Sequence, residues 1–186
     1  MPLPTPSCER ELLHTRTIEC KGYLRSDGLW DIDGWLTDIK TYNFPNKDRV
    51  EIKAGEALHG MGLRITIDEM MTIRDCVAVT DFSPFSLCGD ITPSFKKLIG
   101  LRITQGLTKN VQERLGGVHG CTHLVELVKP LATTAFRTLV GRRMGKLSAA
   151  LKSGTIRKPP VIDTCQAWAS DGPVIKREFP DYYTGA

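Results

Sequence analysis

The chain has 186 residues, of which 41% are hydrophobic, so it is long enough to bury the core of one domain. No stretch approaches the roughly 20 consecutive apolar residues that a membrane-spanning helix needs. The Met-Pro-Leu-Pro start lacks the basic and apolar parts of a signal peptide. We therefore expect one cytoplasmic domain over residues 1–186, with no membrane association. In that compartment the six cysteines are expected to be thiols or metal ligands rather than disulfides.

The net charge of +4 is unevenly distributed, because the segment 129–158 carries eight basic residues and no acidic one. Such a segment is most often the solvated face of a helix. It can also bind an acidic or coenzyme-A-bearing partner. Phe136 is the only aromatic residue among these charges, and this argues against single-stranded nucleic acid as the partner.

The strand-rich half of the chain is expected over residues 13–82. Apolar and polar residues alternate in four segments, and two turn signals join them in pairs. The predicted strands cover residues 17–26, 29–44, 63–67 and 73–79. Two successive hairpins predict an antiparallel meander of four strands.

The helical half is expected over residues 90–152. Thr92-Pro93 is typical of a helix start, and a second helix is predicted from Thr108 to Gly116. The longest helix follows apolar residues at helical spacing from Leu124 to Leu139, and Pro130 should kink or divide it. A linker is expected over 153–162, and the tail 163–186 should add a short strand or wrap the surface. Strands followed by helices predict an α+β fold, with the sheet packed against about three helices.

The octapeptide His-Gly-Cys-Thr-His-Leu-Val-Glu, residues 119–126, concentrates reactive groups at a predicted helix start. Thr122 is a candidate N-cap, and His123 would then lie near the positive end of the helix, which favours a neutral imidazole. Glu126 shares a helix face with His123 and could orient it as a general base. A capped helix start with an incidental histidine explains the same residues.

A second cluster follows from the alternation of the strand over 29–44. If the alternation continues past Leu36, its core-facing side ends in Asp38, Lys40 and Tyr42. Buried charges need partners, so these three side chains would form an internal ion pair or line a pocket. A β-bulge near Gly34 would instead turn them to solvent.

A metal site is the third possibility. Cys88, Cys121, His123 and Cys165 could hold zinc or an iron–sulfur cluster. The chain has no C-x-x-C pair, and free cysteines are often apolar filler in a core, so this spacing is not diagnostic.

Taken together, several segments of the chain resemble a bacterial family, domain of unknown function 2889. They are residues 13–16, 27–32, 38–42, 114–117, 120–124 and 163–165, and the match extends over nearly the whole chain. Where the family pattern has Cys-His at the tail, this chain has Cys165-Gln166, so no role should rest on a histidine at 166. Through its association with bacterial breakdown of aromatic, lignin-like compounds, the resemblance implies an enzyme acting on a small molecule.

These observations favour a cofactor-independent carbon–carbon lyase that releases formaldehyde from an aromatic substrate by a retro-aldol reaction. In this hypothesis His123 is the base, Glu126 orients it, and a group of donors stabilises the developing anion. The donors are Lys40, Tyr42 and Arg114, and the candidate substrate-binding residues are His14, Arg16, Trp30, Asp38 and Cys121. A metal-binding protein and a binding module remain alternatives, and a homo-oligomer stays open.

Overall fold

A computed structural model describes residues 3–153, 158–159 and 161–185; for residues 141–152 only the backbone is described. The chain divides into two compact units, Met1–Thr138 and Leu139–Ala186. Each unit is described separately below. The first unit contains every residue of the candidate site.

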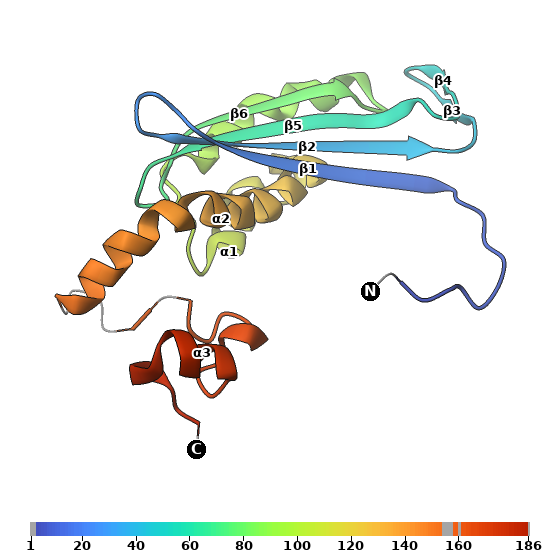
Figure 1. Ribbon diagram of the computed structural model, residues 1–186. Helices are drawn as coiled ribbons and strands as arrows, with labels where there is room; N and C mark the ends of the chain where they lie inside the picture. Colours follow the sequence, from blue (N-terminus) through green and yellow to red (C-terminus); the bar gives the residue numbers. More distant parts are fainter. Residues whose placement is uncertain (1–2, 154–157, 160, 186) are drawn as a thin grey trace. The chain divides into compact units, whose positions relative to one another are not determined.

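A four-stranded antiparallel sheet is the centre of the first unit (Figure 1). Its spatial order is β1-β2-β5-β6, with β1 (His14–Leu24), β2 (Trp30–Lys40), β5 (Ala57–Ile67) and β6 (Ile73–Phe82). A small hairpin of β3 (Phe44–Asn46) and β4 (Val50–Ile52) lies between β2 and β5 in the sequence. The predicted α+β fold and its four-stranded meander are confirmed. The third strand begins at Ala57, six residues before its predicted start.

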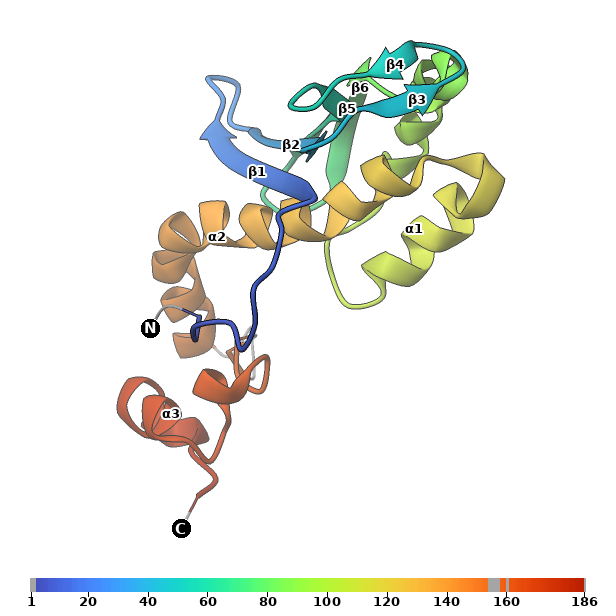
Figure 2. The ribbon, with the colours of Figure 1, turned by 90° about the vertical axis from the view of Figure 1, so that its right-hand side faces the viewer.

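The two faces of the sheet differ in burial, as the alternation of β2 predicts. Ile32 and Leu36 are fully buried on the inner face, whereas Trp35 on the outer face is 36% exposed. The first part of helix α2 (Thr122–Lys152), residues 122–138, covers the inner face (Figures 1 and 2). A Cβ built on Gly34 would lie 3.0 Å from Leu131 of this helix, so the glycine lets helix and sheet approach closely.

The remaining helices of the first unit are η1 (Ser86–Leu98), α1 (Leu107–Leu115) and η2 (Gly117–His119). The segment predicted to begin a helix at Thr92 is instead part of the 3-10 helix η1, which starts earlier. Helix α2 continues through Pro130 as one element rather than two. Buried Leu127 and Leu131 flank the proline, and their packing offsets the hydrogen bond that proline cannot donate.

The tail, expected to add a short strand or to wrap the surface, forms short helices in the second unit. They are η3 (Gln166–Trp168), α3 (Pro173–Glu178) and η4 (Pro180–Tyr182). Proline stands at the start of two of them, a position that suits its fixed φ and missing N–H. Of the predicted linker 153–162, residues 154–157 and 160 lie outside the described residues, as do most side chains of the basic segment 129–158. Lys158, which is described, pairs with Asp163 at 2.6 Å.

All six cysteines are free thiols, so no disulfide constrains either unit. Within the described residues, no helix is both long and apolar enough to cross a bilayer. Packing of the sheet against α2 supplies one part of the core of the first unit, and buried residues of η1 and α1 supply another. The central residues of the part between the sheet and α2 are Ile32, Leu36, Leu63, Ile65, Leu124, Leu127 and Leu131.

Candidate active site

Six polar side chains meet at one end of the inner sheet face, beside the start of α2. We call them the histidine–aspartate cluster: His14, Arg16, Asp38, His59, His123 and Glu126. Strand register explains how three of them come together, because Arg16 lies opposite Asp38 in the β1–β2 pair and Asp38 lies opposite His59 in the β2–β5 pair. Side chains of opposed residues share a face, so Arg16, Asp38 and His59 form one row across three strands.

Asp38 is the centre of the cluster and is only 1% exposed. Its Oδ1 accepts hydrogen bonds from Arg16 Nε and His14 Nε2, each at 2.8 Å. Its Oδ2 accepts from Arg16 Nη2 at 2.7 Å and from His59 Nδ1 at 2.9 Å. Burial alone would raise the pKa of this carboxyl, but the hydrogen bonds from Arg16 and His14 outweigh burial and lower the pKa of Asp38 to about 2. The group is therefore an anion with four donors.

His59 is held in one tautomer by this anion. An ionised carboxylate can only accept hydrogen bonds, so Nδ1 of His59 must carry a proton. In the neutral ring the lone pair is then on Nε2, which is the arrangement of a general base oriented by a carboxylate. Burial and the neighbouring His123 lower the pKa of His59, against the raising effect of Asp38. The ring is therefore neutral near pH 7.

His123 reaches the cluster from the first turn of α2. Its ring lies on that of His59, with 3.8 Å between centroids and an angle of 32° between the planes. Burial and the charge of Arg16 lower the pKa of His123. The helix begins one residue earlier than expected, because the carbonyl of Cys121 accepts the first helical hydrogen bond, from Val125, and Cys121 rather than Thr122 occupies the cap position.

Glu126 does not orient His123 as the sequence suggested. Its carboxylate accepts a hydrogen bond from Nη1 of Arg16 at 2.6 Å and is 47% exposed. Arg16 therefore bridges two carboxylates, Asp38 from the sheet and Glu126 from the helix. This bridge ties the start of α2 to β1, and the carboxylate that fixes an imidazole is Asp38, acting on His59.

Lys40 and Tyr42, expected to share a pocket with Asp38, instead contact each other. Lys40 Nζ donates to the Tyr42 hydroxyl at 2.7 Å and lies 4.9 Å from the ring centroid of Phe44. The β2–β5 register shifts directly after Asp38, so the regular pairing with β5 ends there. Asp38 alone of the three predicted residues hydrogen-bonds a histidine of the cluster.

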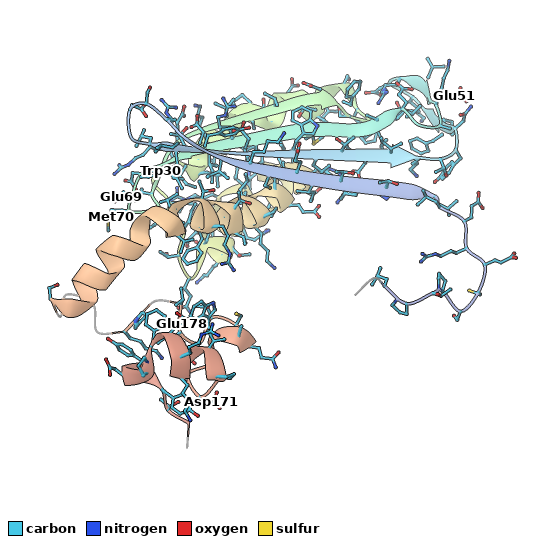
Figure 3. The ribbon with its side chains drawn as sticks, in the orientation of Figure 1. Trp30, Glu51, Glu69, Met70, Asp171 and Glu178 are labelled. Atoms are coloured by element: carbon cyan, nitrogen blue, oxygen red, sulfur yellow. The ribbon has the colours of Figure 1, made fainter. Side chains whose placement is uncertain are left out.

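Two further predicted site residues lie elsewhere. Trp30 is 8% exposed and begins β2, eight residues before Asp38, which corresponds to about 26 Å along an extended strand. Figure 3 shows Trp30 near Glu69 and Met70, at the end of the sheet away from Glu51. Arg114 lies in the last turn of α1, and its Nη1 donates to the carbonyls of Lys97 and Ile99. It thereby ties α1 to the end of η1.

A metal could be held in the cluster, though not by the predicted ligands. In the described part of the chain, one group of three ligand side chains has its donor atoms within 4.8 Å of one another: Asp38, His59 and His123. His123 is the one member that the predicted zinc or iron–sulfur set contains. Cys88 lies on η1, outside this group, and Cys165 belongs to the second unit.

The hydrogen bonds of the cluster argue against a divalent ion on Asp38. Both oxygens of its carboxylate already accept two hydrogen bonds, and two of these four come from the cationic guanidinium of Arg16. A metal ion would have to displace these donors and lie beside a fixed positive charge. The arrangement therefore suits an anion that orients histidines better than one that coordinates a metal.

A hollow of about 430 Å³ lies on the opposite, outer face of the sheet, lined in part by Trp35, Arg64 and Val79. Outer-face side chains cannot contact the imidazoles, because alternate residues of a strand point to opposite faces. The hollow is therefore separate from the cluster.

His59 is the residue that sequence reasoning missed. It lies in the strand Ala57–Ile67 between Leu58 and Gly60, and a single histidine in a strand does not by itself indicate a functional site. One signal was available: a histidine at an inward position of a central strand must find a buried polar partner. Its partner, Asp38, could be named only once the register of β2 and β5 was known.

Comparisons with known proteins add a family and no chemistry. No curated protein and no solved structure matches the chain. The family described as "Protein of unknown function (DUF2889)" matches residues 14–137, a range that begins with His14 of the cluster and includes all of it. The matched range is about two thirds of the chain rather than nearly all of it, and the motif at 163–165 lies outside it. The predicted resemblance is confirmed, and the chain belongs to the DUF2889 family.

Proposed function

We propose that the histidine–aspartate cluster is the active site of a cofactor-independent acid–base enzyme. The observation that carries this proposal is the buried Asp38 carboxylate, which accepts a hydrogen bond from His59 Nδ1 while the ring of His59 lies against His123. A carboxylate-oriented imidazole of lowered pKa is neutral at physiological pH and can accept a proton.

The reaction that we propose is a retro-aldol cleavage of a hydroxymethyl group. His59 Nε2 takes the hydroxyl proton, the carbon–carbon bond breaks, and formaldehyde leaves. The electron pair of the broken bond passes to the carbon that carried the hydroxymethyl group, and that carbon takes a proton from imidazolium. Three of the five N–H groups of Arg16 donate to Asp38 and Glu126, and the other two can donate to the developing anion. No electrons are gained or lost overall.

An aromatic, lignin-like substrate is part of the proposal because of the family association described above. Such a ring can delocalise the developing negative charge, so the substrate supplies the electron sink that a cofactor would otherwise provide. We also propose a cytoplasmic location, since six free thiols suit a reducing compartment.

Formaldehyde release tests the reaction directly. The purified protein is incubated with a panel of aromatic compounds that carry a hydroxymethyl side chain, and released formaldehyde is measured together with the aromatic product. We expect His59→Gln to lower kcat by about 100-fold or more, because general acid–base groups contribute about 10²–10⁴-fold. His123→Gln should also lower kcat.

His119→Gln is the matched control, because His119 is exposed on η2 and outside the cluster. Equal kcat in the His59 and His119 variants would refute the assigned base. No formaldehyde from any member of the panel would refute the reaction class.

Metal binding is a second candidate, because the donor atoms of Asp38, His59 and His123 lie within 4.8 Å of one another. An ion there would have to displace hydrogen bonds that Asp38 accepts from Arg16, His14 and His59. Elemental analysis of the freshly purified protein distinguishes the cofactor-independent enzyme from the metal-binding protein. Stoichiometric metal whose removal abolishes turnover would support the second candidate over the first.

A further inference from the structure

A second group of donor atoms lies next to the histidine–aspartate cluster, and it is built mainly from sulfur. Cys121 Sγ lies 3.8 Å from Met61 Sδ and 3.9 Å from His123 Nδ1. The methionine is 1% exposed, and the cysteine and histidine are half-buried. A thiol, a thioether and an imidazole therefore meet beneath the start of α2.

These positions follow from the fold. Met61 and His59 are alternate residues of β5, so both point to the inner face, toward α2. Cys121 caps the helix and His123 lies in its first turn. The sheet thus supplies one sulfur and the helix supplies the other sulfur and a nitrogen.

We propose that Met61, Cys121 and His123 form a copper(I) site. In a three-coordinate planar site with bonds of about 2.0–2.3 Å, ligand atoms lie about 3.5–4.0 Å apart. The distances from Cys121 Sγ to Met61 Sδ and to His123 Nδ1, 3.8 and 3.9 Å, fall in this range. Cys121 therefore lies at a suitable distance from each of the other two donors to share a copper(I) ion with them.

The donor types select the metal. Thiolate and thioether ligands favour copper(I), whereas zinc sites in proteins use cysteine, histidine and carboxylate rather than methionine. Binding replaces the proton of the Cys121 thiol with copper and releases that proton to solvent. No oxidant or reductant takes part, since copper stays in the +1 state.

A competition titration tests the site in the full-length protein. Copper(I) is supplied anaerobically as its complex with bicinchoninate, and its transfer to the protein is followed by loss of the colour of that complex. We expect Cys121→Ser to weaken copper(I) binding by about 100-fold or more and Met61→Leu by about 10-fold or more, because changing even the partners that orient metal ligands costs about 10–100-fold in affinity. Met61→Leu keeps the apolar volume and should fold.

Cys88→Ser is the matched control, because Cys88 is also a half-buried thiol and lies outside the proposed set. X-ray absorption of the loaded protein should show two sulfur atoms and one nitrogen around copper. Unchanged affinity in both the Cys121 and Met61 variants, or a loss of affinity in Cys88→Ser alone, would overturn the proposal. The titration does not rest on the proposed reaction, because formaldehyde release is scored in metal-free protein and copper affinity without substrate.

Discussion

Replacing Asp38 with asparagine should destabilise the first unit by an amount that depends on pH. The pKa of Asp38 is lowered from 3.8 to about 2 by Arg16 and His14, despite its burial. At about 1.4 kcal/mol per pKa unit, this lowering corresponds to about 2.5 kcal/mol of stability. Asp38→Asn also leaves Arg16, which is 32% exposed, without its main counter-ion. We therefore expect a loss of about 2–3 kcal/mol at pH 7.

The sign of the pH dependence follows from the lowered pKa. The stabilisation by Asp38 is fully present above its unfolded pKa of 3.8 and is lost as the pH falls toward the folded pKa of about 2. The difference in free energy of unfolding between wild type and Asp38→Asn should therefore shrink between about pH 4 and about pH 2.

Urea denaturation followed by tryptophan fluorescence measures this difference. A Trp168→Phe background restricts the signal to Trp30 and Trp35 of the sheet, because Trp168 belongs to the second unit. Asp33→Asn is the matched control: Asp33 lies on the same strand and pairs with one arginine, Arg64, on the exposed face. Surface pairs contribute about 0–1 kcal/mol.

An Asp38 variant no less stable than the Asp33 variant at pH 7 would contradict the central role of the carboxylate. A difference that stays constant down to about pH 2 would show that its charge is not responsible.

Two further predictions concern close packing and proton binding. Gly62→Ala should destabilise the sheet by about 1–3 kcal/mol in thermal unfolding, because a Cβ at this position would lie 2.6 Å from the ring of Trp35. Gly89→Ala is the control, since a Cβ at Gly89 would have no other atom within 4 Å. His59 and His123 should titrate below their ordinary value of 6.5 when followed by NMR, and stability should decline as the pH falls below 6.5, because the unfolded chain binds those protons more readily. Titration of both rings above 6.5 would contradict their burial.

Much of the fold followed from local patterns. Alternation along β2 predicted which side chains enter the core, and Ile32 and Leu36 are buried there while Trp35 is not. Such alternation involves only residues close together in the chain, so it predicts burial without knowledge of which strand or helix packs against the segment. The tail was less predictable, since residues 166–182 form helices of three to six residues, too short for a clear periodicity.

The candidate site was only partly visible in the sequence. Cys121, His123 and Glu126 were recognised from one octapeptide, and Asp38 from the alternation of β2. The hydrogen-bond partners of these residues were not recognised. These bonds join residues that are 21 to 110 positions apart in the chain, so they depend on how the strands and the helix pack together.

The sequence by itself determined the presence of the four long strands, the inward direction of Asp38 and, to within one residue, the start of α2. Only the tertiary structure decided the partners of these side chains. Asp38 accepts a hydrogen bond from His59, and Arg16 forms an ion pair with Glu126. Lys40 donates to Tyr42. The physical reason is register. A shift of one residue between β2 and β5 would turn His59 to the other face of the sheet, and no local pattern in either strand reports that register.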